Sequence, residues 1–96
     1  MNVLFHPDAE LEFNAAIDYY ETIENGLGYD FSLEIASTIA RIIDFPKAWL
    51  VIEGELRRAL VKRFPYGILY AEDQDNIYVV AIMHLHRDPE YWKLRI

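Results

Sequence analysis

The sequence contains no cysteine, which excludes a disulfide framework, a thiolate nucleophile and a thiolate metal site. It also lacks an apolar run near the roughly 18 residues that would suggest a membrane span. The apolar start at residues 3–5 stops at His6-Pro7, far short of the apolar region of a signal peptide. By elimination we expect a cytoplasmic protein without membrane association.

Basic residues are scarce in the first half of the chain. Residues 1–54 contain two basic residues against ten acidic ones, whereas residues 55–96 contain seven against six. This balance disfavours broad binding to phosphate backbones, because such binding scales with the number of phosphates neutralised. We interpret the acidic side chains as solvated helix faces, and a local basic site is expected only in the second half.

The length of 96 residues and the hydrophobic share of 53% predict one domain, residues 1–96, with a single core. Asp8 is the expected N-cap of a first helix, and Asn25-Gly26 is the expected left-handed C-cap. Pro46 is expected to stop a second helix. In order, the predicted elements are a strand over 2–5, a helix from 7–8 to 25–26, a helix from 27–30 to 44–45, and a loop over 46–55 whose Trp49, Leu50, Val51 and Ile52 tuck against the core.

Three strands are predicted in the second half, over residues 57–64, 67–71 and 77–85, with a polar hairpin loop at 73–76. The last of them, IYVVAIMHL, is apolar on both faces, which favours a strand covered on each side. Strict alternation predicts one face that turns from apolar to polar along its length. That face would contain Tyr78, Val80, Ile82, His84 and His86.

The expected fold is therefore α+β, with the order β-α-α-β-β-β. Two helices joined by a short connection form an antiparallel hairpin. An antiparallel sheet would pack one face on this helical hairpin and leave its other face partly open.

The element order, the segment RRALVKRFPYGILY and the ending HLHRDPEYW together resemble the RelE/ParE superfamily of toxins from type II toxin–antitoxin systems, the plasmid stabilisation type. The resemblance covers essentially the whole chain and is strongest over 57–70 and 77–92. It implies a prokaryotic toxin that is encoded beside a cognate antitoxin and silenced by tight binding of that antitoxin.

The superfamily contains ribosome-dependent mRNA endoribonucleases (RelE-like) and inhibitors of DNA gyrase (ParE-like). Gly67 stands where many of the nucleases have an arginine before a Leu-Val-Tyr-like triplet, and residues 50–56 lack the lysine cluster that some carry. The ending resembles the ParE-like side more. The resemblance therefore favours a non-enzymatic gyrase inhibitor; the alternatives are an mRNA endoribonuclease and a non-toxic, toxin-like binding protein.

Nuclease activity would require a base, an acid and a cation at one phosphate. If the chain is a nuclease, the candidates are expected to converge on the open sheet face. His84 and His86 could also chelate a metal, but zinc prefers three or four protein ligands and the sequence offers no third, so neither metal nor cofactor is expected. The catalytic candidates are Lys62, Arg63, His84, His86 and Arg87.

Two binding surfaces are predicted. Arginine and aromatic side chains dominate binding hot spots, so the basic, aromatic C-terminal end is the expected target-binding surface: Arg87, Tyr91, Trp92, Lys93 and Arg95. The opposing interpretation is that Trp92 and Ile96 only seal the core. The second helix has a first apolar stripe, Phe31, Ile35, Ile39 and Ile42, and a second apolar stripe that requires a cover of its own. We expect an amphipathic antitoxin helix to cover the second stripe, with an antitoxin strand at any free sheet edge. This stripe consists of Leu33, Ala36, Ala40 and Ile43.

Overall fold

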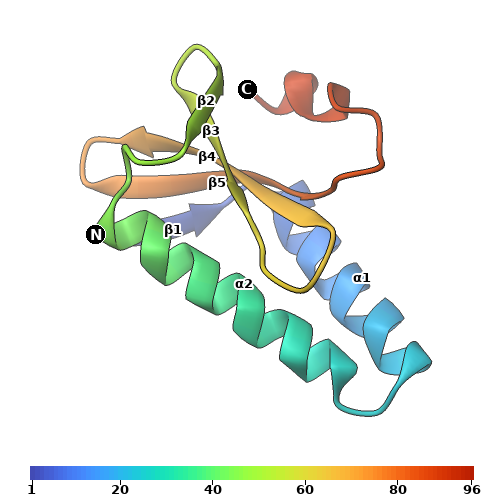
Figure 1. Ribbon diagram of the computed structural model, residues 1–96. Helices are drawn as coiled ribbons and strands as arrows, with labels where there is room; N and C mark the ends of the chain where they lie inside the picture. Colours follow the sequence, from blue (N-terminus) through green and yellow to red (C-terminus); the bar gives the residue numbers. More distant parts are fainter.

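The chain folds into a five-stranded sheet with two long helices and a short C-terminal 3-10 helix in the computed structural model, which describes residues 1–96 (Figure 1). The predicted α+β order is confirmed, with one additional strand, β2. The elements are β1 (Asn2–Phe5), α1 (Pro7–Ile23), α2 (Leu27–Asp44), β2 (Leu50–Glu53), β3 (Leu56–Leu60), β4 (Tyr66–Asp73), β5 (Asn76–His84) and η1 (Tyr91–Arg95).

The strand order in the sheet is β1-β5-β4-β3-β2. Neighbours are antiparallel except at the β1 edge, where β1 pairs parallel with β5. The parallel pairing follows from the chain path, because the helical hairpin and three strands separate β1 from β5 and return the chain in the same direction. The predicted antiparallel sheet is therefore mixed at this one edge.

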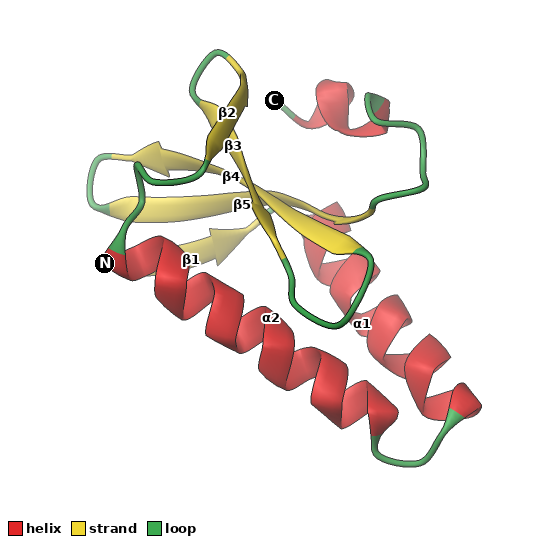
Figure 2. Cartoon of the chain, in the orientation of Figure 1, coloured by secondary structure: helices red, strands yellow, loops and turns green.

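The helical hairpin packs on one face of the sheet, and η1 lies over part of the other (Figure 2). Phe31, Ile35 and Ile42 of α2 belong to the main core, which also contains residues of β3, β4 and β5. A smaller cluster on the opposite face contains Leu69, Met83 and Trp92, with Trp92 contributed by η1. β5 is thus covered on both faces, as its apolar sequence predicts.

The predicted loop over 46–55 is wrong because residues 50–53 form an edge strand. Gly54 at φ 53° makes the turn that joins β2 to β3, and a left-handed turn of this kind suits glycine. Leu50 and Val51 are 63% and 47% exposed, since an edge strand presents side chains to solvent instead of the core. Trp49 and Ile52 are half-buried and pack against the core as predicted.

Both predicted caps of α1 are also wrong. His6, not Asp8, is the N-cap, and its Nδ1 accepts a hydrogen bond of 3.0 Å from the backbone N–H of Asp8. The helix ends at Ile23, and Gly26 at φ 88° instead starts α2. The backbone N–H of Gly26 donates to the carboxylate of Glu21 at 2.9 Å, so a side chain of α1 fixes the helix connection.

The predicted strand over 57–64 is shorter than expected, because β3 ends at Leu60 and Arg63 adopts φ 70° in the following turn. In β5, a β-bulge breaks the strict alternation. Leu69 pairs with Ala81 and Tyr70 pairs with Val79, so Val80 is left without a partner residue in β4.

The bulge reverses which face later residues of β5 occupy. Ile82 packs in the helix-side core with Ile77 and Val79, whereas Val80 packs in the cluster beneath η1. His84 follows Ile82 and lines a cavity against α1. The prediction of one shared face from residue 78 to residue 86 is therefore wrong.

No helix has the length and hydropathy required to cross a membrane.

The buried Tyr70 side chain predicts how the stability of the fold changes at alkaline pH. Its side chain is fully buried, its hydroxyl donates to the Pro46 carbonyl at 2.6 Å, and burial raises its pKa from 10.0 to about 12, with Arg57 partly opposing the shift. A raised folded-state pKa contributes stability that is present below pH 10.0 and is lost as the pH rises towards about 12. We expect the free energy of unfolding to fall across that window.

Urea titrations at about pH 8 and about pH 11 measure the slope of the free energy of unfolding against pH. Tyr70→Phe should make the slope less steep, whereas Tyr29→Phe, which removes an exposed hydroxyl, should leave it unchanged. An equally steep slope in the Tyr70→Phe variant would contradict the assignment.

Candidate functional site

The edge of β5 loses its strand partner beyond β1, and side chains take over its backbone hydrogen bonds. The β1 pairing reaches Val79, whose carbonyl accepts from the His6 N–H at 2.8 Å. Beyond Val79, the Val80 carbonyl accepts from Arg95 Nη1 at 3.2 Å, and the Ile82 N–H donates to Oε1 of Glu12 at 3.1 Å. A carboxylate and a guanidinium therefore substitute for a missing strand.

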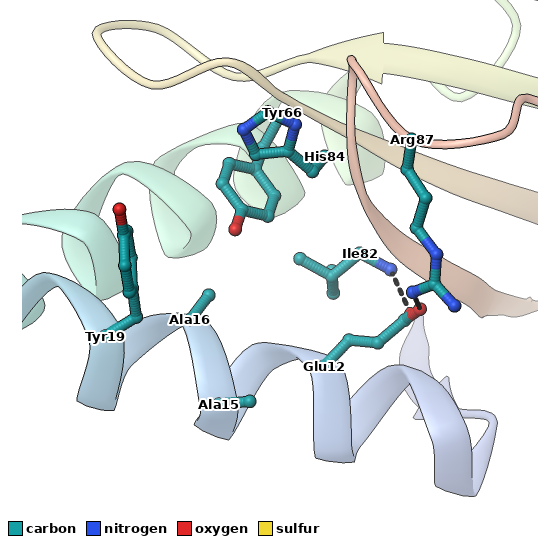
Figure 3. Close-up of a pocket in the computed structure, with 8 residues that line it drawn as sticks. All are labelled: Glu12, Ala15, Ala16, Tyr19, Tyr66, Ile82, His84 and Arg87. Atoms are coloured by element: carbon teal, nitrogen blue, oxygen red, sulfur yellow. Dashed lines mark hydrogen bonds and ion pairs between the residues drawn. The ribbon is translucent and has the colours of Figure 1, made fainter.

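Glu12 on α1 is the centre of a cluster of hydrogen bonds, and Figure 3 shows its contacts with Ile82 and Arg87. Oε1 accepts from the Ile82 N–H and from Arg95 Nη1 at 2.8 Å, and Oε2 accepts from Arg95 Nη2 at 3.0 Å. Oε2 also accepts from the Tyr91 hydroxyl at 2.6 Å and from Arg87 Nη1 at 3.3 Å. The Glu12 and Arg95 side chains are only 13% and 11% exposed, so their fork-shaped ion pair is largely removed from water.

The ring of Tyr91 contacts two guanidinium groups. The Cζ atoms of Arg87 and Arg95 are 3.6 and 4.9 Å from the ring centroid, which is the geometry of a cation–π contact. Burial, followed by the hydrogen bond to Glu12, raises the pKa of Tyr91 far above its usual value. The phenol therefore stays protonated and remains a donor to Glu12.

The predicted target-binding residues divide into an inward and an outward set. Tyr91 and Arg95 are held by Glu12. Trp92 is 3% exposed and packs between η1 and the sheet, and its Nε1 donates to the Pro89 carbonyl at 2.6 Å. Arg87 and Lys93 keep 53% and 42% of their side chains exposed. Lys93 pairs with Glu90 at 3.2 Å and Glu53 at 3.5 Å, which raises its pKa.

Two apolar residues that the sequence reasoning did not select follow Lys93 and Arg95 directly in the sequence. Leu94 is 99% exposed and Ile96 is 66% exposed. Ile96 therefore does not seal the core, whereas Trp92 does. We define the C-terminal surface as Arg87, Lys93, Leu94 and Ile96.

The nuclease candidates form two groups: Lys62 and Arg63 lie in the β3–β4 turn, and His84, His86 and Arg87 lie at and just beyond the end of β5. Arg63 pairs with Asp30 of α2 at 3.6 Å, and Lys62 beside it is exposed in the β3–β4 turn. The His84 ring contacts the ring of Tyr66 with centroids 5.1 Å apart, and His86 contacts His84 at 5.2 Å. His84 and Arg87 do line one cavity, but this cavity lies on the helix side of the sheet.

The histidine pair is connected by a backbone contact. The His86 N–H donates to Nδ1 of His84 at 3.1 Å. No group of three or more histidine, aspartate or glutamate side chains is arranged around a common point where a metal ion could bind.

The predicted second stripe of α2 is largely open to solvent. Leu33 is 49% exposed, and Ala36 and Ala40 are also exposed, whereas Ile43 is half-buried against the main core. Tyr29, which is 66% exposed, extends the stripe by one turn towards the helix N-terminus. We define the α2 stripe as Tyr29, Leu33, Ala36 and Ala40.

Sequence reasoning missed Glu12, although a signal for it exists. Glu12 precedes Ala16 by four residues and is adjacent to Phe13, so helical spacing places it at the margin of the buried face of α1. An acidic residue at such a position requires donors, because a carboxylate is costly to bury without them. Its five donors lie on β5, on η1 and in the segment that joins them, which periodicity within α1 could not reveal.

The family described as "ParE toxin of type II toxin-antitoxin system, parDE" matches residues 3–89. A solved chain from the "Chromosomal ParDE TA system from P. aeruginosa" is similar with a TM-score of 0.63 and 14% identity, over 90% of this chain and 97% of that chain. A comparison with curated proteins found no match. At this identity the structural likeness shows the fold, and the family match extends over most of the sequence. The chain therefore belongs to the family of ParE toxins of type II toxin–antitoxin systems.

Proposed function

We propose that this ParE-family toxin arrests growth by binding DNA gyrase in the cytoplasm, without catalysing a reaction of its own, and that its cognate antitoxin neutralises it. The engagement of Arg63 by Asp30 and of Arg87 by Glu12 is the observation that carries the non-enzymatic part of this proposal. The gyrase target is proposed from the ParE family membership.

Phosphodiester cleavage needs an acid, a base and a cation within hydrogen-bond reach of one phosphate. Here Arg63 is directed to Asp30 on α2, while Arg87 is engaged by Glu12 and by the ring of Tyr91. His84 faces α1 rather than the open face of the sheet. These contacts favour a binding protein over an enzyme.

The C-terminal surface is the part of the molecule that we assign to the target. It combines two exposed apolar side chains, Leu94 and Ile96, with the cations of Arg87 and Lys93. Such a combination gives a large desolvated contact surrounded by charges that select an acidic partner. The acidic first half of the chain lacks a comparable group of cations.

The α2 stripe is the surface that we assign to the antitoxin. Its four side chains recur at helical spacing and remain uncovered in the isolated chain, which suits the apolar face of an amphipathic helix. We expect Leu33→Asp to weaken antitoxin binding about tenfold, because an apolar contact is replaced by a desolvated charge worth at least about 1.4 kcal/mol.

Calorimetry with the antitoxin encoded beside this chain measures that loss. Leu11→Asp is the matched control, since Leu11 is 66% exposed on α1 and lies outside both assigned surfaces. Equal affinities for the Leu33→Asp and Leu11→Asp variants would remove the α2 stripe from the interface.

Induction of the chain without its antitoxin tests the proposed activity. We expect growth arrest without new mRNA ends in primer extension. Codon-positioned cuts that disappear in a His86→Ala variant would establish the endoribonuclease alternative. Normal growth at full expression would support the non-toxic binding protein instead.

A further inference from the structure

The cavity between α1 and the end of β5 has an unusual balance of polar groups. Its volume is about 230 Å³, and it is lined by Glu12, Ala15, Ala16, Tyr19, Tyr66, Ile82, His84 and Arg87. Figure 3 shows the rings of Tyr66 and His84 on one side, Tyr19 and the two alanines of α1 on the other, and Arg87 beside Glu12. Most of the lining residues are hydrophobic, so the few polar groups determine what can bind.

Glu12, the only carboxylate of the cavity, cannot accept a ligand's donor. Its two oxygens already accept five hydrogen bonds, and a carboxylate offers about four lone-pair sites. The two guanidinium groups of Arg87 and Arg95 offset its charge. Asp8 adds a further acid 3.8 Å from Arg95 Nε, but it is not part of the cavity lining.

Three further polar side chains of the cavity, those of Tyr66, His84 and Arg87, can donate hydrogen bonds. Nδ1 of His84 accepts from the His86 N–H, so in the neutral imidazole the proton is on Nε2 and can be donated. The hydroxyl of Tyr66 points into the space towards α1 (Figure 3), and burial raises the pKa of this phenol, which keeps it protonated. Arg87 adds a guanidinium whose side chain is 53% exposed.

From this geometry we propose that the cavity binds a carboxylate side chain, aspartate or glutamate, of the cognate antitoxin. The carboxylate would accept from Tyr66, His84 and Arg87 while its methylene groups contact Ala15 and Ala16. We choose the antitoxin as the source of this carboxylate because the parDE family pairs the toxin with an antitoxin. In addition, a carboxylate bound at Arg87 would cover part of the C-terminal surface, and covering the target-binding surface is how an antitoxin would neutralise the toxin. The inference rests on the proposed function and adds the chemistry of the partner.

The test uses the full chain and the antitoxin encoded beside it. Ala15→Phe fills the cavity from an exposed helix position, and Tyr66→Phe removes one donor while keeping the ring. We expect at least about a tenfold loss of antitoxin affinity for Ala15→Phe, and about a fivefold loss for Tyr66→Phe, as for one hydrogen bond. Asn14→Phe, an exposed neighbour outside this cavity, is the control and should bind as the wild type does.

Single Asp→Asn and Glu→Gln variants of the antitoxin then identify the occupant. One of them should lose about tenfold in affinity for the wild-type chain and markedly less for the Arg87→Gln chain, which is the coupling that a double-mutant cycle detects. Wild-type affinity of both the Ala15→Phe and Tyr66→Phe chains would overturn the cavity assignment while leaving the proposed function intact. Weaker gyrase binding with unchanged antitoxin affinity would assign the cavity to the target and also overturn it. If the wild-type chain binds no neighbouring product, the proposed antitoxin fails and the cavity proposal fails with it.

Discussion

Replacing Glu12 with glutamine is expected to lower the free energy of unfolding by about 3 to 5 kcal/mol, the usual cost of removing one partner from a buried ion pair. Arg95, which is 11% exposed, would lose its fork-shaped acceptor. The amide of glutamine keeps only one acceptor oxygen, so either the Ile82 N–H or Nη2 of Arg95 would face an amide donor in place of its acceptor. Both losses leave buried donors unpaired.

Thermal unfolding monitored by circular dichroism measures this effect. A loss of 3 kcal/mol in a domain of this size corresponds to a fall in Tm of at least about 12 °C. Glu10→Gln is the matched control, because Glu10 is exposed on the same helix and forms no ion pair. A Tm for Glu12→Gln within a few degrees of that control would show that the cluster contributes little to stability.

Leu94→Asp is expected to abolish growth arrest without unfolding the chain. Leu94 is 99% exposed, so its replacement removes no core contact. Loss of a hot-spot residue costs at least about 2 kcal/mol, which corresponds to roughly a thirtyfold weaker target affinity. Ile23→Asp is the control, because Ile23 is 57% exposed at the end of α1 that is remote from η1 (Figure 1).

Lost toxicity could result from a lost target contact or from unfolding of the chain. Colony counts after induction, together with the Tm of each purified variant, separate these two causes. The expected result is survival of cells that express Leu94→Asp, with an unchanged Tm. Arrest equal to that caused by Ile23→Asp would exclude Leu94 from the target surface. A deletion of residues 91–96 is a weaker test, since it would also remove Trp92 from the core and Arg95 from Glu12.

The fold could be predicted from the sequence where side-chain periodicity determines it. The helical spacing of Phe31, Ile35 and Ile42 and the apolar run of β5 both lead to the observed packing. The bulge at Val80 could not be predicted in this way, because Tyr78, Val80 and Ile82 alternate normally in sequence. The bulge arises instead in the pairing of β5 with β4. Because of the bulge, His84 faces α1.

The binding surfaces were predictable in part. Exposure of the stripe at Leu33, Ala36 and Ala40 follows from its position opposite the first apolar stripe of α2. The C-terminal end was less predictable, because residue type alone does not distinguish an anchor from a core residue. Tyr91 is held by Glu12, 79 residues away in sequence, and no local pattern in the chain contains that contact.

Supercoiling of relaxed plasmid by purified DNA gyrase is the most direct test of the proposal that this chain is a gyrase inhibitor controlled by an antitoxin. The chain alone should block supercoiling, the preformed complex with its antitoxin should not, and the Leu94→Asp chain should inhibit roughly thirtyfold less well. Full gyrase activity in the presence of excess wild-type chain, under conditions where the same preparation cuts ribosome-bound mRNA, would contradict it.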